Sequence, residues 1–295
     1  MNKYPLKYPP GSSWLFIRIY GGPQALEGWL IGRFRMMLES WKESGIVERF
    51  HYLHYLDPDY HLRLRFYLSD PVRSGDLLTQ IARSCEQLME DELVWKIEVG
   101  TYEPEYERYG IQRMLLVEEW FGVDSECWLN EISDQPAGCD QQIWKSAMRS
   151  VDALLNDFGA ILDEKVRLTG LMKESLASIT GITKQMRLQL DGKYRKMAGE
   201  VEWVMAGIPV PGYQIWQERT NKTADCVKSI QATFESRDKL LNSSFLPDLI
   251  HMSLNRAFRT RHRYQELVVY DFLSRYYESV KARNEKSGSI QPENR

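Results

Sequence analysis

The chain has 295 residues, 43% of them hydrophobic and 27% charged, which is the composition of a globular protein able to bury a substantial core. Lysine and arginine number 38 against 41 aspartates and glutamates, and the net charge of -3 argues against a dedicated nucleic-acid binder. The N-terminal stretch "MNKYPLKYPPGSS" lacks the apolar core of a secretory signal, and no apolar run reaches the roughly 18 residues of a membrane helix. The 4 cysteines form no CxxC pair, so we expect a reducing cytoplasm and no metal site.

The first hundred residues carry both strand and helix patterns. Strands are indicated by aromatic and β-branched runs, and helices by apolar residues at intervals of three and four. In chain order the predicted elements are a strand at 13–21, a helix at 24–44, strands at 48–56 and 60–69, a helix from 70 to about 91 and a strand within 92–105. Asp57, Pro58 and Asp59 separate the two middle strands and favour a tight turn, so this pair predicts a hairpin.

After residue 110 the pattern becomes helical. The predicted helices cover 113–132, 141–162, 166–179, 226–241, 246–258 and 264–280, and a loop with two prolines lies at 206–213. Gly122 predicts a break in the first of these helices, with Asp124 and Ser125 capping its second piece. The expected fold class is α+β, with a mainly antiparallel sheet and helices in the N-terminal part and a helical C-terminal part. We expect an N-terminal extension at 1–12, one domain at 13–284 and a disordered tail at 285–295.

The hairpin strand "DPDYHLRLRFYL" at 57–68 is the first candidate for chemistry. As a strand it places His61, Arg63 and Arg65 on one face and leucines on the other. The planar guanidinium of arginine offers a fixed fork of donors that suits carboxylates. The alternative is an exposed sheet face that carries solvated charge.

A second candidate is "TYEPEYERYG" at 101–110. Arg108 could add a further cation to the site, held in position by Glu103 or Glu105. The alternative is a surface loop with internal ion pairs, each contributing about 0–1 kcal/mol. The spacing alone does not choose between the two.

A third candidate is "LIHMSLNRAF" at 249–258. On a helix Asn255 lies one turn beyond His251 on the same face, where it could orient the imidazole ring. Histidine is the side chain whose charge changes near neutral pH, so His251 could handle a proton. The alternative is a core histidine satisfied by a backbone carbonyl.

Five stretches in this order resemble the elimination domain of lantibiotic dehydratases, a fold family that also includes the thiopeptide-type bacteriocin biosynthesis proteins. The resembling stretches lie at 14–21, 57–66, 102–110, 118–125 and 251–256, and the resemblance spans roughly 13–280. The chain departs from the family's pattern at His54, where an arginine is usual, and at Ile111, where a second glycine is usual.

The resemblance implies a lyase that acts without a cofactor on a ribosomally made precursor peptide with a leader, expelling glutamate from glutamylated serine or threonine. Arg65 and Arg108 would bind the glutamyl group, with Arg63 as the alternative to Arg65, and His251 would move a proton. The further substrate-binding candidates are His61, Glu105, Asn255 and Arg256. The implied partner is a separate glutamylation protein. For this chain we expect no direct binding of tRNA and no membrane partner, and a homodimer is possible.

Two rival functions stay open. Stand-alone members of the family include thiopeptide pyridine synthases, which join two dehydroalanines in a formal 4+2 cycloaddition and lose the leader peptide. Arg65, Arg108 and His251 favour elimination, whereas His54 and Ile111 leave room for the synthase. A non-catalytic module that binds the precursor peptide is the third hypothesis.

Overall fold

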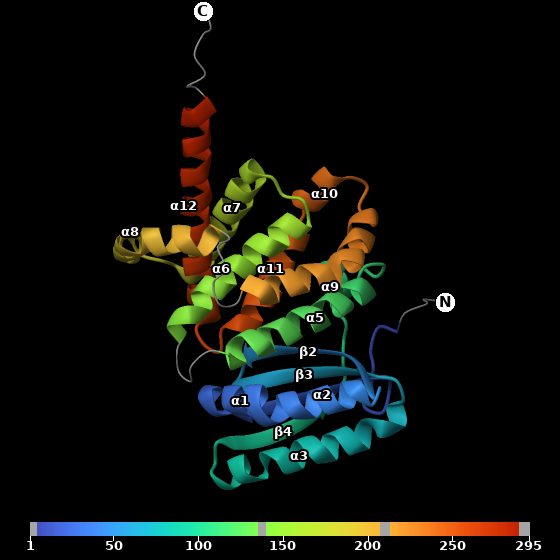
Figure 1. The fold of residues 1–295 in the computed structure, drawn as a ribbon. Coiled ribbons are helices and arrows are strands. Elements are labelled where there is room, and N and C mark those ends of the chain that lie inside the picture. Colours follow the sequence, from blue (N-terminus) through green and yellow to red (C-terminus); the bar gives the residue numbers. More distant parts are fainter. Residues whose placement is uncertain (1–4, 135–139, 207–212, 289–295) are drawn as a thin grey trace, which may run out of the picture.

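The structure, a computed structural model, describes residues 5–134, 140–206 and 213–288. Its N-terminal part holds a four-stranded antiparallel sheet, and its C-terminal part is helical. Figure 1 shows these two parts stacked on one another, with α5 (Met114–Ser133) lying where they meet. The α+β fold predicted from the sequence is confirmed.

The strands are β1 (Trp14–Gly21), β2 (Val47–Leu56), β3 (Tyr60–Leu68) and β4 (Val94–Gly100). The sheet order is β2-β3-β1-β4, and all neighbours are antiparallel. The helices that connect the strands are α1 (Pro23–Trp29), a π-helical segment (Leu30–Phe34), α2 (Arg35–Glu43), a 3-10 turn (Pro71–Arg73) and α3 (Ser74–Glu90). All four predicted strands exist, and the 48–56 and 60–69 pair is the predicted hairpin.

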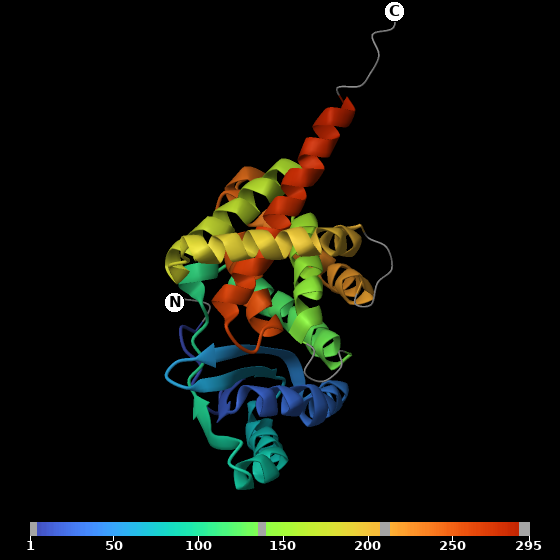
Figure 2. The same cartoon turned by 90° about the vertical axis from the view of Figure 1, so that its left-hand side faces the viewer.

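Helices α1, α2 and α3 cover one face of the sheet, as Figures 1 and 2 show. Leu62, Leu64 and Phe66 of β3 point into this layer and are fully buried in the main core. The other face carries the alternate residues of each strand. The segment before β1 reaches this second face, where the backbone of Tyr8 pairs with that of Tyr102 in an isolated bridge.

The remaining helices are α4 (Tyr106–Tyr109), α5, α6 (Asp140–Asp157), α7 (Leu162–Thr180), α8 (Lys184–Met205), α9 (Tyr213–Ala232), α10 (Arg237–Leu241), α11 (Phe245–Ala257) and α12 (His262–Gly288). Helices α5 and α11 pack along β2, which is an edge strand, and α12 lies along α7. None of the described helices is both long and apolar enough to cross a membrane.

The predicted break at Gly122 is wrong, because α5 runs through it without interruption. Gly122 is needed for a different reason: a Cβ atom there would lie 3.3 Å from the backbone oxygen of Phe50. The missing side chain lets α5 approach β2 closely. Asp124 and Ser125 therefore lie inside the helix rather than at a cap.

Helices α8 and α9 also differ from the sequence predictions. Helix α8 is absent from them because only Val201 and Val204 of it are buried, which leaves little apolar periodicity to detect. Helix α9 begins well before the predicted 226. Residues 207–212 of the predicted loop and 289–295 of the predicted tail lie outside the described residues, whereas 285–288 continue α12.

Candidate active site

Strand β3 presents its basic residues on the sheet face opposite α1, α2 and α3. His61, Arg63 and Arg65 alternate with the core leucines, as the predicted strand requires. Arg63 lies opposite Arg18 of β1, and Arg65 lies opposite His51 of β2. The sheet pairing thus gathers cations from several strands on one face.

Arg65 is 7% exposed and stacks between two aromatic rings. Its guanidinium carbon lies 5.1 Å from the ring centre of Phe16 and 5.6 Å from that of Tyr102. Its Nε and Nη1 atoms are buried and have no hydrogen-bond partner among the described residues. A buried donor of this kind costs free energy unless a ligand or water satisfies it. Arg65 is therefore suited to bind an anion.

His61 holds Arg63 in place. The backbone oxygen of Asp59 lies 2.8 Å from Nδ1 of His61, and Nε of Arg63 donates to its Nε2 over 3.1 Å. Nδ1 must then carry the proton and Nε2 must accept, so the ring is neutral. Burial, and secondarily the charge of Arg63, lowers the pKa of His61, which agrees with this state. This hydrogen bond fixes the guanidinium of Arg63, which also lies over the ring of Tyr55.

Glu118 of α5 is a buried carboxyl beside this arginine-bearing face. It accepts a hydrogen bond of 2.5 Å from the hydroxyl of Tyr102 and is only 1% exposed. Burial raises the pKa of Glu118 to about 7, although Tyr102, Arg49 and Arg65 all oppose the rise. A carboxyl that titrates near neutrality beside an arginine is typical of functional sites. Its place in the resembling stretch 118–125 was the only signal for it in the sequence.

Arg108 and His251, distant in sequence, lie in one cluster formed by α4, α11 and α12. Arg108 pairs with Glu105 at 2.8 Å and with Asp248 at 3.6 Å, and its Nη1 contacts the sulfur of Met252 at 3.6 Å. The charge of Arg108 opposes the rise in the pKa of His251 that Glu266 causes, so the two groups lie within electrostatic reach. The predicted support of Arg108 by Glu105 agrees with this geometry.

Glu266 of α12 holds the imidazole of His251. Its carboxylate oxygens lie 2.9 and 3.1 Å from Nδ1 of the ring. Burial alone would lower the pKa of His251, but the hydrogen bond and charge of Glu266 raise it above the ordinary value. The side chain of His251 remains 42% exposed, whereas that of Glu266 is 2% exposed. The ring is therefore oriented from the protein side and reachable from outside.

Asn255 does not orient His251. Its side-chain oxygen instead accepts a 2.9 Å hydrogen bond from the backbone N–H of His54, on the outer edge of β2. The residue that performs the expected task, Glu266, lies on the next helix and has no short-range sequence signal.

Arg256 is fully buried in the helical part and pairs with Asp124 at 3.1 Å. Asp124 also pairs with Arg219 at 2.9 Å, and all three side chains are 0% exposed. These contacts are those of a structural ion-pair network. They give no support to the substrate-binding role expected for Arg256.

The three residues expected to act together are brought together only in part. Arg108 and His251 share a cluster, but no hydrogen bond or ion pair among the described residues joins Arg65 to either of them. Tyr102 connects the two regions, because its ring stacks on Arg65 and its hydroxyl lies within electrostatic reach of Glu105.

Of the two departures from the family pattern, His54 lies on the side of the sheet opposite the arginine-bearing face. His54 pairs with Leu62 across the hairpin and therefore lies on the helix-covered side of the sheet. There its Nδ1 lies 2.6 Å from the hydroxyl of Tyr60, and burial lowers its pKa to about 3. Ile111 is 41% exposed on the turn that follows Gly110.

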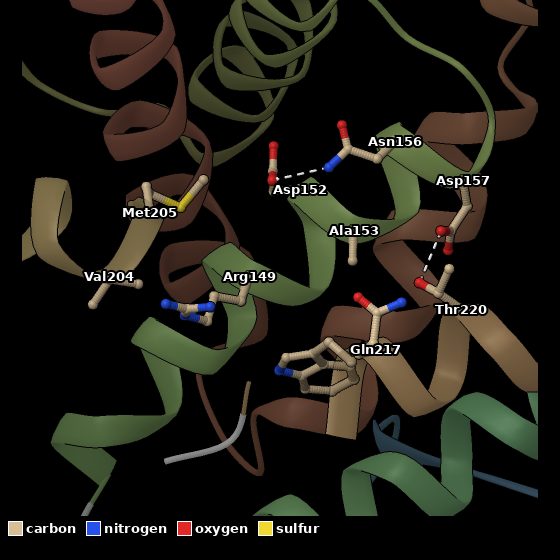
Figure 3. A pocket seen from close by; sticks show the side chains of 10 residues that line it. Arg149, Asp152, Ala153, Asn156, Asp157, Val204, Met205, Gln217 and Thr220 are labelled. Carbon is tan, nitrogen blue, oxygen red and sulfur yellow. Dashed lines mark hydrogen bonds between the residues drawn. The ribbon is translucent and has the colours of Figure 1, made fainter. Parts of the chain in front are cut away.

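A cavity of about 260 Å³ lies elsewhere, between α6, α8 and α9 (Figure 3). Arg149, Asp157, Gln217 and Thr220 are among its lining residues, and Asp157 accepts a 2.8 Å hydrogen bond from Thr220. None of the described lining residues is one of the predicted site residues. Within residues 5–134, 140–206 and 213–288, no group of three or more His, Cys, Asp or Glu is placed to hold a metal ion.

Solved structures with the same fold were found. The chain is 19% identical to the tRNA-dependent lantibiotic dehydratase MibB from Microbispora sp. 107891, with a TM-score of 0.69 over 92% of this chain and 29% of MibB. It is 11% identical to TbtD, the pyridine synthase from thiomuracin biosynthesis, with a TM-score of 0.59 over 91% of this chain and 99% of TbtD. For TsrL the identity is 13% and the TM-score 0.63, over 95% and 99% of the two chains.

No curated protein sequence matches the chain. The sequence does match the family described as lantibiotic biosynthesis dehydratase C-term over residues 14–277, which includes all four strands and the Arg65, Arg108 and His251 positions. The chain therefore belongs to the C-terminal family of lantibiotic biosynthesis dehydratases, as the resemblance of its sequence predicted.

Proposed function

We propose that this protein is a lyase that eliminates glutamate from glutamylated serine or threonine residues of a ribosomally made precursor peptide. The Cα proton is removed, the Cβ–O bond breaks, and glutamate leaves as a carboxylate. The peptide is left with dehydroalanine or dehydrobutyrine. A separate glutamylation protein would supply the ester.

The observation that carries this proposal is the pairing of His251 with Glu266 beside Arg108. A buried carboxylate that holds Nδ1 of a histidine fixes the ring and leaves Nε2 directed elsewhere, as in catalytic histidine–carboxylate pairs. The exposed side of the ring is then available to a substrate proton. The raised pKa of His251 keeps it able to exchange a proton near neutral pH.

Arg65 is assigned to the leaving carboxylate. The charge of Arg108 is already matched by Glu105 and Asp248, whereas Arg65 has no carboxylate within 4 Å among the described residues and two buried nitrogens without partners. A guanidinium in this state stabilises negative charge that develops on the departing oxygen, because it has no competing partner and little water around it. Arg108 is assigned to the glutamyl group on the His251 side.

The experiment that tests the proposal incubates the full chain with a synthetic peptide that carries a glutamyl ester on one threonine. We expect release of free glutamate and a peptide with the mass of dehydrobutyrine. His251→Ala and Arg108→Ala should each let the glutamylated peptide accumulate, with unchanged circular dichroism. Arg83→Gln, which removes an exposed charge of α3 on the opposite side of the sheet, is the control and should retain activity.

Two outcomes would contradict elimination. Conversion of a linear peptide that contains two dehydroalanines into a pyridine macrocycle, with no glutamate release from the ester, would assign the protein to pyridine formation. Tight binding of the precursor peptide with neither product would assign it to peptide presentation. Wild-type turnover in both alanine variants would remove the proposed site.

A further inference from the structure

Four arginines form a row across the sheet face opposite α1, α2 and α3. This arginine face consists of Arg18 on β1, Arg49 on β2, and Arg63 and Arg65 on β3. Arg18 lies directly opposite Arg63, and like charges in opposed strand positions destabilise a sheet. Burial, and after it the charges of Arg65 and Arg18, lowers the pKa of Arg63. Such an arrangement needs negative charge to balance it.

The described residues supply little of that charge. Glu98 of β4 pairs with Arg18 at 3.6 Å but also with Lys96 at 2.6 Å. Arg49, Arg63 and Arg65 have no carboxylate within 4 Å in the described part of the chain, and Nε of Arg18 is buried without a partner. Glu118 is a poor counter-charge, because burial keeps its carboxyl partly protonated near neutral pH. The face therefore has an excess of positive charge.

Aromatic rings hold these arginines in position. The guanidinium carbons of Arg63 and Arg49 lie 3.3 Å from the ring centre of Tyr55 and 4.1 Å from that of Tyr67. Phe16 supports Arg18 at 4.8 Å in the same way. A fixed guanidinium loses less conformational entropy on binding an anion than a free one does. The arrangement is thus prepared for anionic groups.

The same stacking argues against a nucleic acid as the occupant. Proteins that bind single strands offer open aromatic faces on which bases stack. Here guanidinium groups cover the rings of Tyr55 and Tyr67, and Trp14 and Phe16 are 1% and 5% exposed. Carboxylates, which pair with the guanidinium fork and require no ring, fit the face better.

We propose that Arg18 and Arg63 form a docking surface for acidic side chains of the precursor peptide that flank the residue being modified. This inference rests on the proposed function, which places the leaving carboxylate of the modified residue at Arg65. Arg63 and Arg65 are two positions apart on one strand face, a separation of about 6.6 Å. An extended peptide repeats its side chains on one side at the same spacing. An aspartate or glutamate two positions from the modified residue therefore meets Arg63, with Arg18 beside it.

The test measures binding of a fluorescein-labelled, unmodified peptide of serine, glycine and glutamate in which each serine has a glutamate two positions away. A matched peptide carries glutamine at every glutamate position. We expect the acidic peptide to bind the full chain, the glutamine peptide to bind at least 10-fold more weakly, and the affinity to fall as salt rises from about 0.05 to 0.5 M, because added ions screen exposed charges. Equal binding of the two peptides, or no binding of the acidic peptide, would overturn the proposal.

Matched variants locate the surface. Arg18→Gln and Arg63→Gln should each raise the Kd of the acidic peptide about 3- to 30-fold, since each removes a charge-assisted hydrogen bond at a partly exposed site. Arg83→Gln on α3 removes the same charge from the other side and should leave the Kd within twofold. Because Arg63 also contributes to packing, Arg18→Gln, at a side chain that is 32% exposed, is the variant whose loss of binding does not depend on the core, and circular dichroism of both variants checks the fold. An equal loss of affinity in Arg83→Gln would assign the effect to net charge and overturn the proposal. Binding of a single-stranded RNA that the acidic peptide cannot displace would assign the surface to nucleic acid instead.

Binding and elimination can fail separately. The unmodified peptide carries no glutamyl ester, so its binding does not need the elimination chemistry. His251→Ala should retain binding and lose glutamate release. Selective binding of the acidic peptide by a wild-type protein that releases no glutamate would keep the docking surface and refute the proposed activity. Equally fast elimination from two glutamyl-ester peptides, one with flanking glutamates and one with flanking glutamines, would keep the activity and refute the docking surface.

Discussion

Nδ1 of His251 lies 2.9 Å from a carboxylate oxygen of Glu266, which is itself almost completely buried on the following helix. The hydroxyl of Tyr270 contacts the same oxygen at 3.3 Å. The carboxylate is therefore fixed by its own helix before it meets the histidine. The protonation of His251 therefore depends on Glu266, a residue that is buried behind the ring, away from its exposed side.

Glu266→Gln should shift the pH dependence of elimination to lower pH. The carboxylate raises the pKa of His251, so its replacement by a neutral amide lowers the midpoint of the limb that reports His251, whether the ring acts as acid or base. We also expect kcat to fall about 10-fold or more because the ring loses its orientation. The kcat–pH profile of both proteins is the measurement, and identical midpoints would contradict the assignment of Glu266 as the positioning residue.

The same pair should make the folded state pH-dependent. Because the pKa of His251 is raised above its unfolded value, the stabilisation by Glu266 is fully present below the unfolded pKa and is lost as pH rises through the folded pKa. The difference in unfolding free energy between wild type and Glu266→Gln should therefore shrink between pH 6 and pH 9. Urea unfolding at several pH values gives this difference.

Arg65→Gln should lower kcat/KM for the glutamylated peptide about 10- to 100-fold, the loss expected for charge-assisted hydrogen bonds to a carboxylate. Arg65→Lys should restore little of it, since an ammonium lacks the planar fork and would not fill the space between Phe16 and Tyr102. Steady-state kinetics with thermal unfolding as a control separates this effect from misfolding. Full activity of the lysine variant would show that charge alone suffices.

Glu118→Gln should stabilise the protein, and more so as pH rises. The carboxyl has a pKa of about 7 in the folded state against 4.5 as the ordinary value, so the folded state holds more protons and loses stability as pH rises from 4.5 to 7. This loss amounts to at most about 3 kcal/mol. Glutamine can still accept the Tyr102 hydrogen bond and does not titrate. The unfolding free energy of the variant minus that of wild type should grow over this pH range and then level off.

The control for this prediction is Glu86→Gln, which changes an exposed carboxyl on α3. Its difference from wild type should be small and nearly independent of pH. Parallel stability curves for wild type and Glu118→Gln would mean that the carboxyl is charged at all these pH values, contrary to its burial.

Asp124→Asn should destabilise the helical part strongly. The substitution leaves Arg219 and Arg256 buried without their shared counter-charge, and breaking a buried ion pair in this way costs about 3–5 kcal/mol. Asp225→Asn, at an exposed position of α9, is the matched control and should change stability by less than about 0.5 kcal/mol. Urea unfolding measures both. A small effect at Asp124 would contradict the assignment of its carboxylate as the counter-charge of the two buried arginines.

The sequence allowed good prediction wherever a pattern is local. Strand β3 was predicted within a residue because basic and apolar residues alternate from His61 to Phe66, and the period of two assigned the faces of Arg63 and Arg65 without further information. The turn at Asp57 and Pro58 was recognised for a similar reason, since both residues act on their own backbone.

Features set by contacts between distant segments could not be predicted in this way. Glu266 holds His251 only because α12 folds back onto α11, and no spacing rule connects the two residues. Gly122 looked like a break because its function, a close approach to Phe50 of β2, is invisible along the chain. Arg256 looked like a ligand because a sequence does not reveal that Asp124 meets it inside the helical part.

The outer edge of β2 has backbone donors that are already hydrogen-bonded to helix side chains. The side chains of Asn255 and Ser125 accept hydrogen bonds from the backbone N–H groups of His54 and Tyr52, so helices occupy donors that a further strand would need. Since β2 and β4 are the two ends of the sheet, growth by strand addition is left to β4. Any extended chain that joins this sheet, from a second molecule or from a peptide, would therefore do so beside Lys96 and Glu98, and self-association through the hairpin side is disfavoured.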